Sequence, residues 1–404
     1  MDRKYFFWIF VLLVSGLLSF WNEGYFDGTK RFLAGVFFID STTEKHLKDA
    51  YADAKKGGEK IKILIVPGHD NDSWGTEFKN IKEADLNLEA AENLAGFLRQ
   101  KNEFEVILTR DKNGYNSELS SYFSKNQKEI EKFVQKNVET MNSYIQSGFV
   151  EKYTKGVSHN TAPEEVVSRL YGINKWANEN KIDIVIHIHF NDDPERNYYG
   201  FGQYAGFAVY VPEKQFSNAK GSRALAKPIF AQLQKYFPVS DLPKEKNGIV
   251  EDQKLIAVGA YNTLDAAGLL IEYGYIYESQ FVNSEIRPLI IKELAFQTYS
   301  GIMNFFEGEA GNNRTSAILP YFWKDDLAKG MKNSKEVLAL QTALILRNFY
   351  PPKNFSKNDC PISGNFGECT FSALKEFQKE YSIEPANGFF GPMTRKKLNE
   401  LYSS

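Results

Sequence analysis

Short apolar runs alternate with amphipathic helical segments between residues 60 and 308, and this alternation restricts the fold more than any other feature of the chain. Apolar runs of about four to eight residues are typical of strands. We predict strands over residues 61–66, 103–109, 182–189, 207–211 and 269–273. Strands that alternate with helices favour an α/β fold, in which a mixed sheet carries helices on both faces.

Three residues in these segments have the spacing of metal ligands. His69 follows the first predicted strand, His189 ends the third, and Glu83 opens an amphipathic helix. Ligands of such sheets usually gather at the carboxyl ends of the strands. Two imidazoles and one carboxylate leave the fourth position of a tetrahedral zinc ion open, as in catalytic sites. We therefore predict a Zn²⁺ site formed by His69, Glu83 and His189.

A candidate general base ends the last predicted strand, where Glu272 follows Leu269-Leu270-Ile271. A carboxylate in such a place is costly to bury unless it has a role or a partner. Partial desolvation would raise its pKa and make it a better proton shuttle for hydrolysis. A structural salt bridge is the alternative interpretation of Glu272.

The ends of the chain and its charge limit where the protein works. Residues 5–21 carry no charge and follow Arg3 and Lys4, which predicts an uncleaved signal anchor over residues 1–24 rather than a cleaved signal peptide. The polar residues 25–59 then read as a tether, and the rest of the chain lies outside the cytoplasm. The net charge of −2 gives no reason to expect nucleic acid as a partner.

Residues 113–160 are an insert that the sheet does not need. Their apolar residues recur at intervals of three and four, which predicts a long amphipathic helix or a helical hairpin. Either this insert packs on the sheet, or it is a lid over the zinc cleft. Deleting it should raise basal activity if it is a lid.

The carboxyl-terminal part reads as a separate small domain. Residues 309–332 are predicted to be a linker, because Gly308, Gly311 and two asparagines lie around its start, and residues 333–404 are predicted to form three helices. Cys360 and Cys369 lie nine positions apart. In an exported protein such a pair suggests a disulfide that closes a small loop, and two free thiols are the alternative.

Six blocks of the larger domain resemble, in order, the zinc-dependent N-acetylmuramoyl-L-alanine amidases of the amidase-3 family. The blocks are Pro67-Gly68-His69, Glu83–Leu88, Val106–Arg110, Arg169 with Asn174, Ile188–Asn191 and Leu270–Gly274. The resemblance implies zinc binding by His69, Glu83 and His189 and catalysis by Glu272. It also implies hydrolysis of the amide bond between N-acetylmuramic acid and L-alanine, for cell-wall remodelling or daughter-cell separation. The alternatives are a non-catalytic scaffold on the cell wall and cleavage of another amide in the peptide stem.

The chain departs from the family pattern in two places near the site. Residues 70–75 replace the family's Gly-Gly-x-Asp stretch, and His187 stands where the family has serine. Candidates to support the ligands are Asp70, His187 and Asn191. His187 shares a strand face with His189, so it either orients a ligand or is a hydrogen-bonded core histidine.

Residues 333–404 resemble the three-helix peptidoglycan-binding module. Apolar positions such as Leu340 and Phe377 read as its core, and Thr370 and Thr394 read as amino-terminal helix caps. The resemblance implies peptidoglycan as a partner and the bacterial cell envelope as the location, with the membrane contacted through the anchor. Some family members use a helix to block the site until a partner removes it, so an activator protein acting on residues 113–160 is a further candidate partner.

Overall fold

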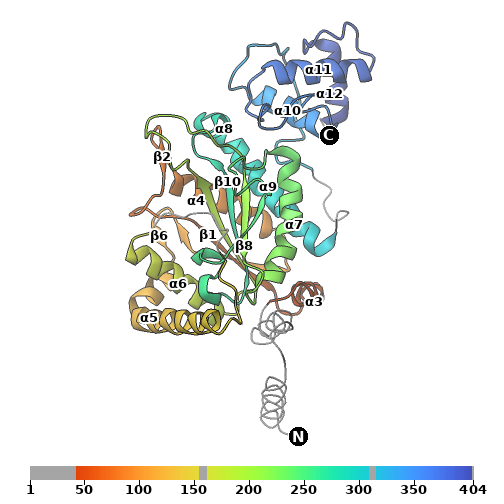
Figure 1. Ribbon diagram of the computed structural model, residues 1–404. Coiled ribbons are helices and arrows are strands. Elements are labelled where there is room, and N and C mark those ends of the chain that lie inside the picture. The colour runs from red at the N-terminus through yellow and green to blue at the C-terminus, as the bar shows by residue number, and fades with distance from the viewer. Residues whose placement is uncertain (1–41, 154–161, 309–314, 403–404) are drawn as a thin grey trace, which may run out of the picture.

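The computed structural model describes residues 42–153, 162–308 and 315–402. Its centre is a six-stranded sheet in the order β4-β1-β7-β10-β8-β9 (Figure 1). The strands are β1 (Ile61–Pro67), β4 (Phe104–Leu108), β7 (Ile184–Asn191), β8 (Ala208–Pro212), β9 (Ile249–Asp252) and β10 (Ala267–Tyr275). β8 and β10 are antiparallel and the other neighbours are parallel, so the predicted mixed sheet is confirmed.

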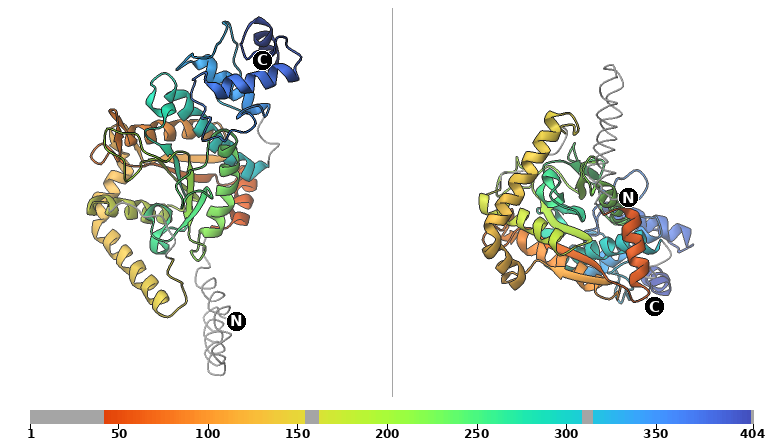
Figure 2. Two further views of the ribbon diagram at one scale, coloured as in Figure 1. Left: turned by 45° about the horizontal axis from the view of Figure 1, so that its top comes forward. Right: turned by 90° about the horizontal axis from the view of Figure 1, so that it is seen from below.

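Helices cover both faces of this sheet because successive side chains of each strand point to opposite sides. In β1, Ile63 and Ile65 pack into the larger core, whereas Leu64 and Val66 pack into a second cluster on the other face. The first face carries α3 (Glu44–Ala54), α4 (Glu83–Leu98), α7 (Ala219–Tyr236) and α9 (Arg287–Glu307). The second face carries α5 (Ser117–Gln146), α6 (Glu164–Glu179), η1 (Ile256–Val258) and η2 (Ala260–Asn262). Figure 2, seen from below, shows α5 and α3 on opposite sides of the sheet.

Short elements gather near the carboxyl ends of the parallel strands. Two hairpins, β2 (Glu77–Phe78) with β3 (Ile81–Lys82) and β5 (Arg110–Asp111) with β6 (Gly114–Tyr115), follow β1 and β4. The short α8 (Ser279–Val282) follows β10. Figure 1 shows β2 and α8 at the same end of the sheet.

The insert forms one long helix, α5, which has non-helical backbone angles at Asn126. The side chain of Asn116 caps it by accepting a hydrogen bond from Leu119 N at 2.9 Å. Leu119 and Ile130 are buried, and α5 packs against α6 and η2. This packing agrees with a helix that lies on the sheet, and residues 154–161 of the insert lie outside the described ranges.

Two predicted boundaries are wrong because isolated apolar residues in polar segments are buried by distant parts of the chain. Within the predicted tether, residues 44–54 form α3, whose Leu47 and Tyr51 are buried in the larger core. Within the predicted linker, Leu319, Trp323 and Leu327 are buried. The described parts of both segments, residues 44–54 and 315–332, therefore pack against folded domains.

The predicted signal anchor over residues 1–24 lies outside the part of the chain that the structure describes. Among the described residues, none of the helices has the length and apolar character needed to cross a membrane.

The carboxyl-terminal module consists of α10 (Lys335–Leu346), α11 (Glu368–Glu380) and α12 (Pro392–Tyr402). The prediction that Thr370 and Thr394 are helix caps is wrong, because both are buried within the first turn of their helices. Each hydroxyl accepts a hydrogen bond at 3.0 Å from a buried glutamine of the preceding helix, Gln341 or Gln378. These paired contacts hold consecutive helices together inside the module.

The module is docked on the larger domain. The buried carboxylate of Glu293 in α9 accepts hydrogen bonds from Ser316 Oγ at 2.9 Å and from the backbone N–H groups of Ala317 and Ile318. Asn358 Nδ2 donates to an Asp241 carboxylate oxygen at 3.2 Å, a second link between the domains. Figure 1 shows α10, α11 and α12 beyond α8 and the end of α9.

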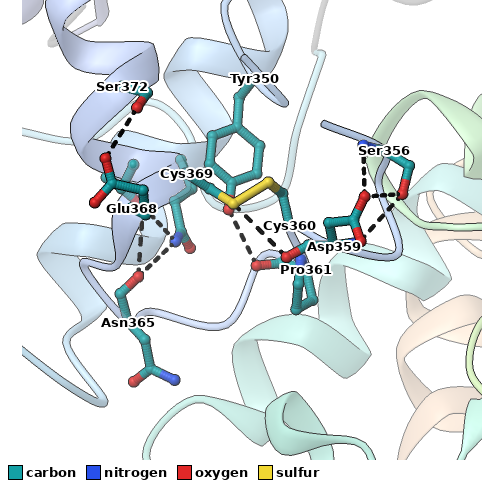
Figure 3. Close-up of a disulfide and its surroundings, with 11 residues drawn as sticks. Tyr350, Ser356, Asp359, Cys360, Pro361, Asn365, Glu368, Cys369 and Ser372 are labelled. Carbon is teal, nitrogen blue, oxygen red and sulfur yellow. Dashed lines mark hydrogen bonds between the residues drawn. A yellow bond between two sulfur atoms is a disulfide. The ribbon is translucent and has the colours of Figure 1, made fainter. Parts of the chain in front are cut away.

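Cys360 and Cys369 form a disulfide with an S–S distance of 2.02 Å (Figure 3). Because the bridge closes a short loop, replacing both cysteines by serine should lower the free energy of unfolding of the module by about 2–3 kcal/mol. Urea unfolding of the full chain measures this. Reductant should destabilise the wild type to a similar extent and leave the double variant unchanged, and equal stability of oxidised wild type and variant would contradict the prediction.

Candidate active site

Three neighbouring parallel strands bring three of the predicted residues to one edge of the sheet. Gly68 N donates to Ile188 O at 2.9 Å, so His69 follows β1 beside the end of β7. The register of β10 on β7 places Glu272 directly opposite His189. His69, His189 and Glu272 therefore stand at the ends of β1, β7 and β10, which are consecutive strands of the sheet.

Glu83 lies between the two imidazoles. Its Oε2 is 3.1 Å from His69 Nε2, and its Oε1 is 3.0 Å from His189 Nδ1. The ligand atoms offered by His69, Glu83 and His189 all lie within 4.8 Å of one another. Glu83 is the first residue of α4, where the helix dipole favours a negative charge. The three side chains could hold one metal ion.

Two glycines leave room for these side chains to converge. A Cβ atom on Gly68 would lie 2.2 Å from the His189 ring, and one on Gly75 would lie 2.3 Å from Glu83 Oε2. Gly75 also has a φ of +76°, which side chains rarely tolerate. His69 itself has a φ of 60°, a strained backbone state that is typical of functional sites. The nitrogen and oxygen donors and their close packing fit a hydrolytic zinc ion.

Arg110 fixes the first histidine against the helix that carries the carboxylate. Its buried guanidinium donates through Nη2 to Gly68 O at 3.0 Å and to Ala84 O at 2.9 Å. The first carbonyl precedes His69 and the second follows Glu83. Arg110 therefore ties the end of β1 to the first turn of α4, which sets the distance between the two ligands.

The pKa shifts of Glu83 and His189 favour the deprotonated forms that bind a metal, whereas the shift of His69 does not. Burial opposes ionisation of Glu83, but the adjacent His69 and His189 hold the pKa of its carboxyl well below the usual range. Burial lowers the pKa of His189, and Glu83 offsets this only partly. Burial also lowers the pKa of His69, but Glu83 outweighs it and the net pKa is raised. Because ligands must be deprotonated, metal binding should displace a proton from His69.

Glu272 is held as an unpaired acid. Its Oε2 is buried and has no hydrogen-bond partner among the described residues. Burial, and then the nearby carboxylates Glu83 and Glu245, raise its pKa well above the ordinary value. The salt-bridge interpretation of Glu272 therefore finds no support in its described contacts. An acid with a raised pKa beside candidate metal ligands has the properties of a proton shuttle.

This raised pKa predicts a pH-dependent effect on stability in the metal-free protein. The folded state favours protonated Glu272, so its contribution to stability is complete below the unfolded pKa and is lost as pH rises through the folded pKa. A Glu272→Gln variant should therefore be more stable than wild type near pH 8, by about 1–3 kcal/mol. The difference should shrink towards about pH 4. Denaturant unfolding across this range measures it, and a difference independent of pH would contradict ionisation of Glu272 as its cause.

The candidate supporting residues have different surroundings. Asp70 accepts a hydrogen bond from Arg169 Nη1 at 2.8 Å and two more from backbone N–H groups of the loop after His69. Asn191 Nδ2 donates to Glu245 Oε1 at 3.3 Å. Asp70 thus shapes the loop that begins at His69, and Asn191 joins the hydrogen bonds around Glu245.

His187 does share a strand face with His189, but it is not a hydrogen-bonded core histidine. Neither of its ring nitrogens has a hydrogen-bond partner among the described residues. Its register partners, Val66 and Leu270, are both apolar. Burial, and then His189, lower its pKa to about 3, so the ring is neutral. Among the described residues, the interpretation of His187 as hydrogen-bonded is wrong, because neither ring nitrogen has a partner and the strand neighbours Val66 and Leu270 carry no polar side chain.

Sequence reasoning missed three residues that organise the site. Asn87 Nδ2 donates to Gly68 O at 2.9 Å, and Arg110 makes the clamp described above. Both residues lie within blocks that resemble the amidase family, and this resemblance could have marked them as site residues. Buried Glu245 accepts hydrogen bonds from Tyr210, Tyr275 and Asn191, and so links the middle of β8 to the ends of β10 and β7. It lies in a Lys-Glu-Lys stretch that reads as solvated, so no sequence signal marked it.

The sequence was compared with known families and curated proteins. Residues 63–284 match the N-acetylmuramoyl-L-alanine amidase family, and residues 333–398 match the peptidoglycan binding domain. No curated protein matches this chain.

Several solved structures are similar to part of the chain. An N-acetylmuramoyl-L-alanine amidase from Clostridium difficile 630 is 19% identical, with a TM-score of 0.39, and covers 62% of this chain and 100% of its own. The CwlD amidase from Clostridioides difficile, solved in complex with the GerS lipoprotein, is 16% identical, with a TM-score of 0.39, over 61% of this chain and 98% of its own. The amidase AmiC2 of Nostoc punctiforme is 16% identical, with a TM-score of 0.36, over 61% and 98%.

Proposed function

Because this chain belongs to the N-acetylmuramoyl-L-alanine amidase family, we propose that it cleaves peptidoglycan with a zinc ion held by His69, Glu83 and His189 and with Glu272 as the general base. The family membership makes the protein an enzyme that hydrolyses the amide bond between N-acetylmuramic acid and L-alanine. The observation that carries the residue roles is the convergence of the three ligands opposite an unpaired acid on the next strand.

Each residue has a defined task in this mechanism. A zinc ion, when bound, supplies a Lewis acid and makes water a stronger nucleophile at neutral pH. Glu272 accepts the proton of the attacking water and passes it to the leaving nitrogen of L-alanine. Its raised pKa suits this task, because the protonated acid must be stable between the two transfers. Arg110 and Asn87 hold the loop of His69 and the start of α4 in place.

Mass spectrometry of the products from purified peptidoglycan tests the bond that is cut. We expect free peptide stems that begin with L-alanine, together with glycan strands that keep their lactyl groups. Shorter stems would show that another amide is cleaved. If a protein that contains one zinc ion per chain left the peptidoglycan intact, the result would favour the non-catalytic scaffold.

The peptidoglycan-binding domain and the amidase activity place the working site at the cell wall, outside the cytoplasm. We propose that residues 1–24 anchor the chain in the membrane. The apolar sequence of residues 5–21 after Arg3 and Lys4 supports this proposal. Carbonate extraction of membranes tests it: the full chain should stay in the membrane pellet, and a chain lacking residues 1–24 should not.

We also propose that the insert of residues 113–160 limits access to the site until an activator protein binds it. Support for a surface that a partner could bind comes from the middle of α5, where Phe133 and Val138 stay partly exposed on a helix otherwise packed against α6 and η2. Deleting the insert should raise the basal rate of peptidoglycan cleavage several-fold. Because Leu119 packs against the sheet, zinc content and thermal unfolding are needed as controls. An unchanged rate in a folded, zinc-loaded deletion would mean that α5 only packs on the sheet.

A further inference from the structure

An exposed group of aromatic rings lies on the loop that follows β7, residues 192–203, which we call the aromatic loop. Tyr198, Tyr199 and Phe201 are 57%, 85% and 63% exposed. The two tyrosine rings meet edge to face, with centroids 5.0 Å apart. Large apolar side chains that remain in water within four consecutive positions are costly, and such patches commonly mark binding sites.

The aromatic loop is rigidly built around one arginine. The guanidinium of Arg196 is almost fully buried and binds both carboxylate oxygens of Asp192, at 2.6 and 2.7 Å. It also donates to the carbonyls of Tyr198, at 2.7 Å, and Gly200, at 3.3 Å. Because the loop wraps its carbonyls around this buried charge, the side chains of Tyr198 and Tyr199 are left facing solvent.

The same contacts fix the aromatic loop to the metal ligands. Thr76 N donates to Glu83 Oε2 at 3.1 Å, and the Thr76 hydroxyl donates to Asp192. Arg196 Nη2 donates to Glu77 O at 3.1 Å. A continuous set of hydrogen bonds thus runs from Glu83 through Thr76 and Asp192 to Arg196. The backbone that carries the exposed rings is therefore held in place relative to the site.

We propose that the aromatic loop binds a sugar of the glycan strand next to the amide bond that is cut. This inference rests on the proposed function, in which the reacting amide joins a peptide to a sugar. Hexopyranose rings present flat C–H faces that stack on aromatic side chains and carry little charge. Asp192, Asp193 and Arg196 form their hydrogen bonds within the loop. The exposed charges nearby are Glu195 and Lys79, and Lys79 lies over the Phe201 ring at 4.9 Å. The contacting rings themselves carry no charge, which favours the C–H face of a neutral sugar over the charged peptide stem.

Equilibrium binding of a peptide-free glycan oligomer to the inactive Glu272→Gln chain tests the proposal. Replacing Tyr198 and Phe201 together by alanine should weaken binding about tenfold. The same replacements in the active chain should raise KM for peptidoglycan by a similar factor while kcat stays within about twofold. Phe322→Ala is the matched control, because Phe322 is 58% exposed and lies outside both the aromatic loop and the matched peptidoglycan-binding region.

Two results would overturn the proposal. One is unchanged glycan binding by a folded Tyr198/Phe201 variant, as judged by an unchanged unfolding temperature. The other is weaker binding of the free peptide stem instead of the glycan, which would make the surface a peptide site. Binding is measured without turnover, so a failure of the sugar site is distinguishable from a failure of the proposed zinc chemistry.

Discussion

Replacing Glu272 by glutamine should lower kcat for peptidoglycan cleavage by about a thousandfold while zinc content stays at one per chain. Glutamine keeps the shape of the side chain but cannot accept the proton of the attacking water. The ligands His69, Glu83 and His189 are untouched, so the loss would report the proton transfer alone. Zinc analysis and product release by the same preparation are the measurements.

A matched control for this variant is Glu293→Gln. Glu293 is also buried and burial also raises its pKa, but it lies in α9 and binds the segment before the module. This control should lower stability and leave kcat within about twofold. Turnover by Glu272→Gln close to that of wild type would contradict the role of Glu272 as general base.

Replacing His189 by alanine should weaken zinc binding by more than about a hundredfold and abolish cleavage. Loss of a residue that merely supports a metal ligand costs about 10–100-fold in affinity, so loss of a ligand should exceed this. Titration with a competing chelator measures the affinity. His46→Ala is the control, because this exposed histidine at the start of α3 contributes nothing to the cluster.

The same chelator titration, repeated at several pH values, tests whether zinc binding depends on the protonation of the ligands. Wild type and His46→Ala should bind zinc more tightly as pH rises through the titration of His69, whose proton the metal displaces. Retention of full zinc affinity by His189→Ala would rule out the three-residue site.

The sheet and the strand ends were predictable from sequence because their signals are local. Apolar runs gave five of the six strands, and motifs at strand ends gave residues that the structure brings together at one edge. β9 was missed because its four residues, Ile249–Asp252, include two acids and read as loop.

The missed features all depend on partners far away in the sequence. Leu47 and Tyr51 are isolated apolar residues in a polar segment, and only the core beneath α3 explains their burial. Glu245 looks solvated in sequence, but it is buried and accepts hydrogen bonds from residues of three strands. Neither propensity nor periodicity carries information about such tertiary contacts, so these assignments needed the structure.

The link through Glu293 has a consequence for how the enzyme meets a polymer. Because Ser316, Ala317 and Ile318 are bound to α9, the module is not carried on a freely swinging chain from that point on. The gain in affinity from two linked binding sites then depends on whether one peptidoglycan strand can reach the active site and the module at their fixed separation. That gain is lost when the geometry forbids it. We therefore expect the spacing and orientation of glycan strands in the cell wall, rather than the local concentration of these strands, to decide which bonds the enzyme cuts first.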